Sequence, residues 1–224
     1  METILSFEED ASLDGLRIGL VEARGLRWAA TPAGGQFLAA IAEAKTRGEA
    51  LISPTRKSAV RAMLRYGAYK PAGRGKPSSE YLLQAALDDD FPAVNFFVDA
   101  ANIVSLLSGY PISILDLDKS GYHLLLRRGR AGENYVFNAG GQTIELADLL
   151  CVCRQAGEDF FPTANPVRDS MATKIFPGAK TIAAVLYAPA GAEGRDLESA
   201  CAKLAAYLGE SAESAEWRVV EAER

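Results

Sequence analysis

The chain has 224 residues, of which 49% are hydrophobic and 24% charged, so its length and composition suit a globular protein with a sizeable core. No apolar run reaches the length of a membrane helix, and the acidic N-terminal segment lacks the apolar stretch of a secretory signal, which together predict a cytoplasmic protein. The formal net charge of −5 argues against a protein that coats nucleic acid.

The N-terminal part of the chain is predicted to be mainly helical. A long strand or a strand pair begins at Leu16, and residues 35–48 carry apolar side chains at helical spacing. Pro54 suits the first turn of a second helix. Three glycines and two prolines make residues 66–77 a loop.

Two further helices are predicted after this loop. Ser78 or Ser79 can cap the first of them, which should end near Leu87 because the three aspartates that follow oppose the helix dipole. The next helix runs from about residue 94 to residue 108 and is ended by Gly109, with a proline two residues later.

Residues beyond Pro111 are predicted to be rich in strands, because short apolar runs alternate with turn residues. The runs are ISILDL, YHLLLRR, YVFN, QTIEL, LLCVCR and TIAAVLYA. Residues 138–141 suit a hairpin turn, an amphipathic helix begins at Arg195, and residues 217–220 suit an edge strand. We therefore expect a single α+β domain over residues 1–224, with helices concentrated in the N-terminal half.

The chain has only three cysteines and one histidine, which limits the disulfides, metal sites and catalytic triads that it can form. An odd number of cysteines argues against a disulfide framework. A more specific role for the cysteines is a zinc site. It would need Cys151, Cys153, the third cysteine and His123 as its four ligands. We expect buried structural thiols, no metal and no other cofactor. A catalytic triad would also have to use His123, which we interpret as a structural residue of a strand.

A set of motif residues stands out in the fourth predicted helix and the strand after it. The set consists of Val98, Asp99, Asn102, Gly109, Pro111, Asp116, Leu117, Asp118 and Lys119. It resembles the editing domain of bacterial phenylalanyl-tRNA synthetase β subunits, the B3/4 domain, and the looser likeness extends over about residues 66–188. The resemblance implies a layered β-structure with helices packed on one side, and a partner in the aminoacylated end of tRNA. The chain is too short for the aminoacylation core, so we expect a free-standing B3/4 domain protein.

The resemblance also indicates which residues surround a pocket. Asn102 matches a pocket asparagine of the family and would contact the substrate amino group or ribose, whereas the structural alternative is a buried amide that satisfies backbone groups. Ser113 stands where the family has a histidine, and Thr173 lies nearest to the position of a family glutamate. These departures imply a pocket of different chemistry. Asp99 and Asp116 are expected to accept hydrogen bonds from turn amides.

The polar loop of residues 165–174 supplies further candidates. Arg168 could hold a phosphate or carboxylate, Asp169 an ammonium group, and Ser170 or Thr173 a water molecule. A solvated turn with an Arg–Asp surface pair is the alternative. The candidate catalytic residues are Asn102, Ser113, Arg168, Asp169 and Thr173. The candidate substrate-binding residues are Gly140, Gly141, Ser170 and Lys174, although the two glycines suit a hairpin turn equally well.

A local basic segment interrupts this acidic chain, because residues 56–76 contain seven basic and no acidic residues. Such a segment suits a transient contact with tRNA phosphates, while a solvated helix face followed by a loop is the alternative. The candidate RNA-binding residues are Lys57, Arg61, Arg65, Lys70, Arg74 and Lys76.

Three functions fit these residues. The first is a trans-acting hydrolase that deacylates a mischarged tRNA, with water as the nucleophile. The second is a non-catalytic module that binds tRNA, another RNA or an amino acid, which the missing family histidine and glutamate favour. The third is an enzyme that acts on a small amino-acid derivative, which the overall acidity favours and the basic segment opposes.

Overall fold

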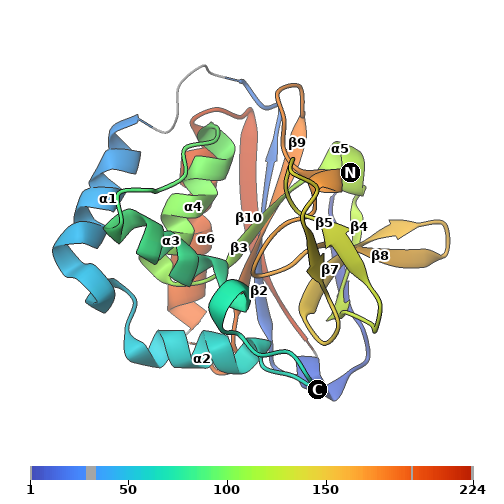
Figure 1. Ribbon diagram of the computed structural model, residues 1–224. Coiled ribbons are helices and arrows are strands. Elements are labelled where there is room, and N and C mark those ends of the chain that lie inside the picture. The colour runs from blue at the N-terminus through green and yellow to red at the C-terminus, as the bar shows by residue number, and fades with distance from the viewer. Residues whose placement is uncertain (1, 29–33, 193, 223–224) are drawn as a thin grey trace.

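The computed structural model describes residues 2–28, 34–192 and 194–222, and its elements form layers (Figure 1). One antiparallel sheet, here the central sheet, has the strand order β10-β2-β9-β3. A second sheet, the outer sheet, has the order β1-β4-β7-β8 and packs on one face of the central sheet. The strands are β1 (Ile4–Phe7), β2 (Arg17–Arg24), β3 (Ile112–Asp116), β4 (His123–Arg128), β5 (Asn134–Val136), β6 (Thr143–Glu145), β7 (Leu150–Ala156), β8 (Asp159–Ala164), β9 (Thr181–Ala188) and β10 (Ser214–Glu221).

Strand β9 is buried on both faces. Ala183, Val185 and Tyr187 join the core between the two sheets. Ile182 and Ala184 alternate with them and join the core under the helices. A strand that is covered on both sides needs apolar residues at every position, which explains the uninterrupted apolar run TIAAVLYA.

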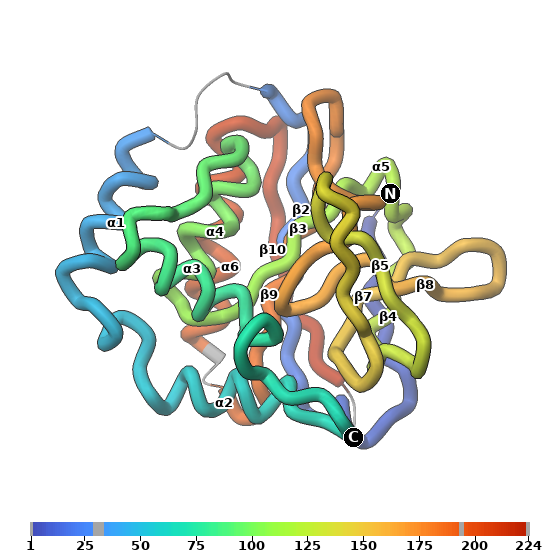
Figure 2. Tube along the Cα trace, viewed as in Figure 1, coloured from blue at the N-terminus to red at the C-terminus, as the bar shows by residue number. Residues whose placement is uncertain are grey.

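Four of the helices, α1, α3, α4 and α6, gather on the opposite face of the central sheet (Figures 1 and 2), whereas α2 and α5 bury apolar side chains in the core between the two sheets. α4 and α6 pack directly on this face, and α1 and α3 pack against α4. This arrangement confirms the predicted layered α+β structure with helices on one side. The helices are α1 (Gly34–Arg47), α2 (Pro54–Leu64), α3 (Ser78–Leu87), α4 (Phe96–Ser108), α5 (Leu117–Ser120) and α6 (Gly194–Gly209).

The helix ends agree with the local sequence in α4 and differ from it in α3. The Asn95 side chain caps α4 by accepting hydrogen bonds of 3.1 Å from two first-turn amides, and Gly109 ends the helix with a φ of 74°. The prediction that Ser78 or Ser79 caps α3 is wrong, because Pro77 occupies the cap position and no side chain closes the turn. The Ser78 hydroxyl therefore does not cap α3.

The predicted strands are confirmed, and two more are present. Residues 138–141 form the predicted turn between β5 and β6, and residues 217–220 belong to β10 at the edge of the central sheet. β1 and β8 lie outside the predicted strands. β1 has four residues and pairs with β4, which lies more than a hundred residues away, and β8 contains Pro162 at a sheet edge.

The three cysteines are buried and free, which confirms the interpretation as structural thiols. Cys151 and Cys153 lie in the core between the sheets, and Cys201 lies in the core under the helices. Burial raises the pKa of Cys153 and of Cys201 to about 12. His123 is exposed at the start of β4. No helix among the described residues is long and apolar enough to cross a membrane.

A substitution of Gly19 in β2 tests how tightly α6 packs on the central sheet. A Cβ atom at this position would clash with the Cys201 sulfur and approach side chains of Leu186 and Leu197 to 3.2 Å. Gly19→Ala should therefore lower the unfolding free energy by about 1–3 kcal/mol in urea denaturation. Gly35→Ala is the matched control, since nothing lies within 4 Å of a Cβ there. Equal unfolding midpoints for the two variants would contradict this packing.

Candidate functional site

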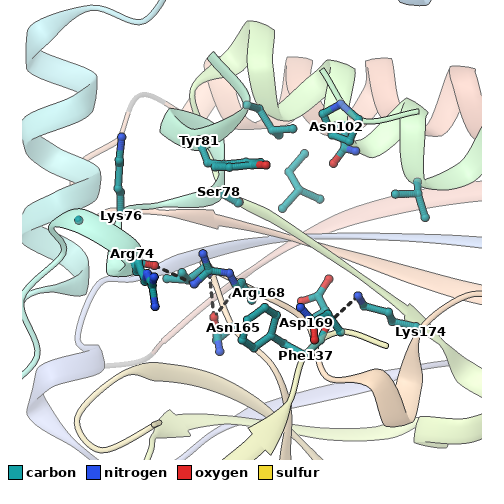
Figure 3. A pocket seen from close by; sticks show the side chains of 17 residues that line it. Arg74, Lys76, Ser78, Tyr81, Asn102, Phe137, Asn165, Arg168, Asp169 and Lys174 are labelled. Carbon is teal, nitrogen blue, oxygen red and sulfur yellow. Dashed lines mark hydrogen bonds between the residues drawn. The ribbon is translucent and has the colours of Figure 1, made fainter. Parts of the chain in front are cut away.

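A cavity of about 450 Å³, here the main cavity, lies between the helices and the loops at one end of the sheets. Its wall comes from the loop before α3, from α3 and α4, from the start of β3, from the hairpin of β5 and β6, and from the loop between β8 and β9. Figure 3 shows Ser78, Tyr81 and Asn102 on the helical side, and Arg168, Asp169 and Lys174 on the opposite side. Segments from distant parts of the chain therefore face one another across the cavity.

The lining combines an apolar wall with separate polar groups, as in many small-molecule sites. The apolar and aromatic lining residues are Tyr81, Leu82, Pro92, Val98, Ile112, Phe137 and Val167. The basic lining residues are Arg74, Lys76, Arg168 and Lys174. The remaining polar side chains are those of Ser78, Asn102, Asn138, Asn165 and Asp169.

The buried amide of Asn165 shapes the wall between β8 and β9. Its side-chain oxygen accepts hydrogen bonds from the backbone N–H groups of Val167 and Arg168, at 2.8 and 2.9 Å. Its side-chain nitrogen donates to the Tyr135 hydroxyl, which itself donates to the Arg168 carbonyl at 2.6 Å. The Ser113 hydroxyl donates to the Asn165 carbonyl at 3.0 Å. These bonds fix the backbone from which Arg168 and Asp169 project.

Two polar atoms of the lining have no hydrogen-bond partner within the described part of the chain. One is the buried Oδ1 of Asp169, whose other oxygen accepts from the Ile114 N–H at 3.0 Å. The second is the buried Oγ of Ser78. Buried polar atoms are normally paired, so these two are candidates for contact with a ligand or water.

Burial gives Asp169 an unusual proton affinity. Desolvation raises the pKa of its carboxyl group to about 6, against the lowering effects of the nearby Ser113 hydroxyl, the Ile114 N–H and the Lys174 charge. A group with this pKa is mainly ionised at neutral pH and can still exchange a proton. Asp169 can therefore hold an ammonium group or serve as a weak base.

Two cations on the same side of the main cavity as Asp169 are held in place by protein groups. The Arg168 guanidinium donates to the Arg74 carbonyl at 2.8 Å and lies 4.8 Å from the centre of the Phe137 ring. Lys174 donates to the Phe137 carbonyl at 2.7 Å (Figure 3). Positive charge is thus fixed on one side of the main cavity before any ligand arrives.

The sequence model of the B3/4 domain matches residues 66–193, which is more than half of the chain. The protein belongs to the B3/4 domain family. This confirms the resemblance that the motif residues carry.

The fold is also similar to a solved structure, the N-terminal fragment of the phenylalanyl-tRNA synthetase β-subunit from Pyrococcus horikoshii. The two share 10% sequence identity, and the TM-score is 0.51. The match covers 97% of this chain and 51% of that chain, so the protein spans about half the length of the synthetase fragment. No curated protein matches the chain.

Within this B3/4 domain, four of the candidate catalytic and substrate-binding residues line the main cavity, namely Asn102, Arg168, Asp169 and Lys174. Gly141 lines a neighbouring cavity of about 680 Å³, which shares Arg74, Phe137 and Arg168 with the main one. Gly140 is exposed in the hairpin. The structure therefore brings together the helix motif and the polar loop, as the resemblance implies.

Three candidate hydroxyl residues lie beneath the cavity wall instead of on its surface. Besides its bond to Asn165, the Ser113 hydroxyl lies 2.9 Å from the Tyr187 hydroxyl. The Thr173 hydroxyl lies 2.8 Å from that of Thr163. The Ser170 hydroxyl accepts from a backbone N–H two residues later, at 3.2 Å. All three are buried, so their groups hold the wall in place.

The motif aspartates have the structural roles expected of them. Asp99 accepts from the Val94 N–H at 2.8 Å, and Asp116 accepts from the Asp118 N–H at 3.1 Å. Burial raises the pKa of Asp99, whose second oxygen has no partner among the described residues. Within the described ranges, no group of three or more His, Cys, Asp or Glu side chains is arranged to hold a metal ion.

The candidate RNA-binding residues divide into two groups. Lys57 pairs with Glu49, and Arg61 pairs with Glu80 through two hydrogen bonds. For the other four, no carboxylate lies within 4 Å in the part of the chain that the structure describes; they are Arg65, Lys70, Arg74 and Lys76. Of these four, Arg74 and Lys76 line the main cavity.

Several lining residues carry no recognisable signal in the sequence. Ser78 suits a helix cap equally well, and Tyr81 belongs to an ordinary amphipathic helix. Phe137 lies in a short apolar strand run, and only the fold brings it beside Arg168. The Asn165-Pro166 pair favours a turn, which is the one local sign of the role of Asn165.

The raised pKa of Asp169 predicts a pH-dependent stability. Below about pH 4 the group is protonated in both the folded and the unfolded state, and its burial then has no ionisation cost. As the pH rises through about 6 the buried carboxyl must ionise, so its contribution to stability is lost, by an amount on the order of 2–3 kcal/mol.

Asp169→Asn should remove this dependence. The unfolding free energy of the variant, relative to the parent protein, should increase between about pH 4 and pH 7 in urea denaturation. Asp159→Asn, at an exposed position of β8, is the control and should leave the pH profile unchanged. Parallel profiles for the parent and Asp169→Asn would contradict the assignment.

Proposed function

We propose that this B3/4 domain hydrolyses the ester of a mischarged aminoacyl-tRNA in trans, with the aminoacyl group bound in the main cavity. The observation that carries the proposal is the Asp169 carboxylate, a buried group with one unpaired oxygen that lines the cavity on the side opposite the Asn102 amide (Figure 3). An aminoacyl ester carries an ammonium group beside its carbonyl, and a carboxylate and an amide oxygen are suitable acceptors for it.

The remaining groups fit the needs of ester hydrolysis by water. Ser78 has an unpaired hydroxyl in the lining and can position the attacking water. The fixed charges of Arg168 and Lys174 can stabilise the negative charge that develops on the carbonyl oxygen. The ribose hydroxyl beside the ester can assist the proton transfer. No nucleophilic side chain is required for this reaction.

The residues beneath the wall act as positioning residues in this proposal. Ser113 supports Asn165, Thr173 fixes the end of the polar loop, and Ser170 caps its 3₁₀ turn. The neighbouring cavity, lined by Gly141, offers space for the terminal nucleotide beside the aminoacyl group. Arg74 and Lys76 lie where the phosphates of the acceptor end would approach.

A second candidate function is a non-catalytic module that binds an aminoacylated tRNA or an amino acid. It is favoured by the engagement of the Ser113 and Thr173 hydroxyls in buried hydrogen bonds. It is also favoured by the described lining of the main cavity, which contains neither histidine nor cysteine. Such a module would bind the same ligand without accelerating hydrolysis.

A deacylation assay separates these two functions. A panel of tRNAs, each charged with a correct or an incorrect amino acid, is incubated with and without the protein. Hydrolysis predicts faster loss of at least one mischarged species, and Asp169→Asn and Asn102→Ala should each slow that loss by about 10²-fold. Asp159→Asn is the control. Binding of the panel without accelerated loss would support the non-catalytic module.

The location of the RNA contact is tested by two matched lysine variants. Lys76→Ala removes a charge from the cavity lining, and Lys57→Ala removes one that pairs with Glu49. Lys76→Ala should weaken tRNA binding several-fold and reduce the salt slope by about one, whereas Lys57→Ala should change neither. Filter binding at a series of salt concentrations measures both quantities. If Lys57→Ala weakened tRNA binding as much as Lys76→Ala does, the RNA contact would include α2 and would not be confined to the cavity lining.

A further inference from the structure

The outer edge of β10 is open among the described residues. β10 has eight residues and pairs only with β2, so one row of its backbone N–H and C=O groups has no partner strand. Glu216 is exposed, and Trp217 is exposed over 40% of its surface. A long edge strand of this kind is a template for pairing with another strand.

The charges on this edge are complementary to themselves. Glu216 and Arg218 flank Trp217. When two copies of β10 run antiparallel with Trp217 opposite Trp217, Glu216 of each copy lies opposite Arg218 of the other. A shift of two residues in either direction instead brings Glu216 opposite Glu216, or Arg218 opposite Arg218. Opposite charges stabilise such cross-strand pairs and like charges destabilise them, so one register is selected.

Contacts with β2 determine on which face of the sheet the side chains of Glu216, Trp217 and Arg218 lie. Glu22 of β2 lies beside Glu216 in the sheet and is 3.4 Å from Arg218, whose guanidinium also pairs with Glu2 and donates to the Thr3 carbonyl, so the arginine is held on this face of the sheet. Trp217 lies beside Val21, whose side chain belongs to the core under the helices. Trp217 of each copy would therefore lie on the helical face, next to that of the other copy.

We propose that β10 is a self-association surface whose partner is β10 of a second copy of this chain. Pairing would join the two central sheets into one continuous sheet. The main cavity lies beside β3, and β3 occupies the opposite edge of the central sheet from β10. The dimer would therefore leave the main cavity of each copy open. The proposal does not depend on the function of that cavity.

Charge reversal tests this proposal through the oligomeric state. E216R or R218E alone places like charges opposite each other at two positions and should raise the dimer dissociation constant by about tenfold or more, as measured by sedimentation equilibrium. An equimolar mixture of the two variants brings opposite charges together again and should form heterodimers. The double variant E216R/R218E should likewise return to the association of the parent protein.

Fold integrity is controlled within the same set. Glu216 is exposed and lies beside Glu22, so E216R should keep the parent circular dichroism spectrum and melting temperature. If R218E and the double variant fail to fold, E216R alone still decides the matter, because it should weaken the association of the parent protein while keeping its fold. A parent protein that stays monomeric at all concentrations overturns the proposal. Unchanged association of a folded E216R variant, or failure of a folded double variant to restore association, overturns it as well.

Discussion

The buried side chain of Asn165 is the group on which the candidate site depends. One amide satisfies two backbone N–H groups and a tyrosine hydroxyl, while a serine hydroxyl satisfies the carbonyl of the same residue. An irregular loop can be buried only when its backbone groups are paired in this way. The loop consequently presents Arg168 and Asp169 to the main cavity from a fixed backbone, and their side chains need little rearrangement when a ligand binds.

The charges in the cavity follow from this fixed wall. The guanidinium of Arg168 lies on the Phe137 ring and the ammonium of Lys174 is held by a carbonyl, so the carboxyl of Asp169 has cations nearby without a direct ion pair. Desolvation dominates, and the carboxyl is less stable ionised than it would be in water. In the proposed function, the ammonium group of an aminoacyl ester would relieve this cost.

Much of the fold and part of the site could be predicted from the sequence. The helix that carries Asn102 ends at a glycine and leads into a strand, so local rules and the family motif agree there. The resemblance places Ser113 and Thr173 at family positions, but only packing shows that their hydroxyls are buried beneath the wall. Ser78 and Phe137 reach the cavity through contacts between segments about sixty residues apart, which no local pattern encodes. β1 escapes prediction from local patterns because its partner strand lies more than a hundred residues away.

The central claim is that the main cavity receives the aminoacyl end of tRNA, and a hydrolysis-resistant 3′-aminoacylamido-adenosine tests it most directly. The measurement is mapping of backbone amide chemical shifts during titration with this analogue. We expect the largest changes at residues 78–82, 98–102 and 165–170, with smaller ones in the hairpin of β5 and β6. Changes confined to other surfaces, or no saturable change with any amino-acid side chain, would contradict the claim.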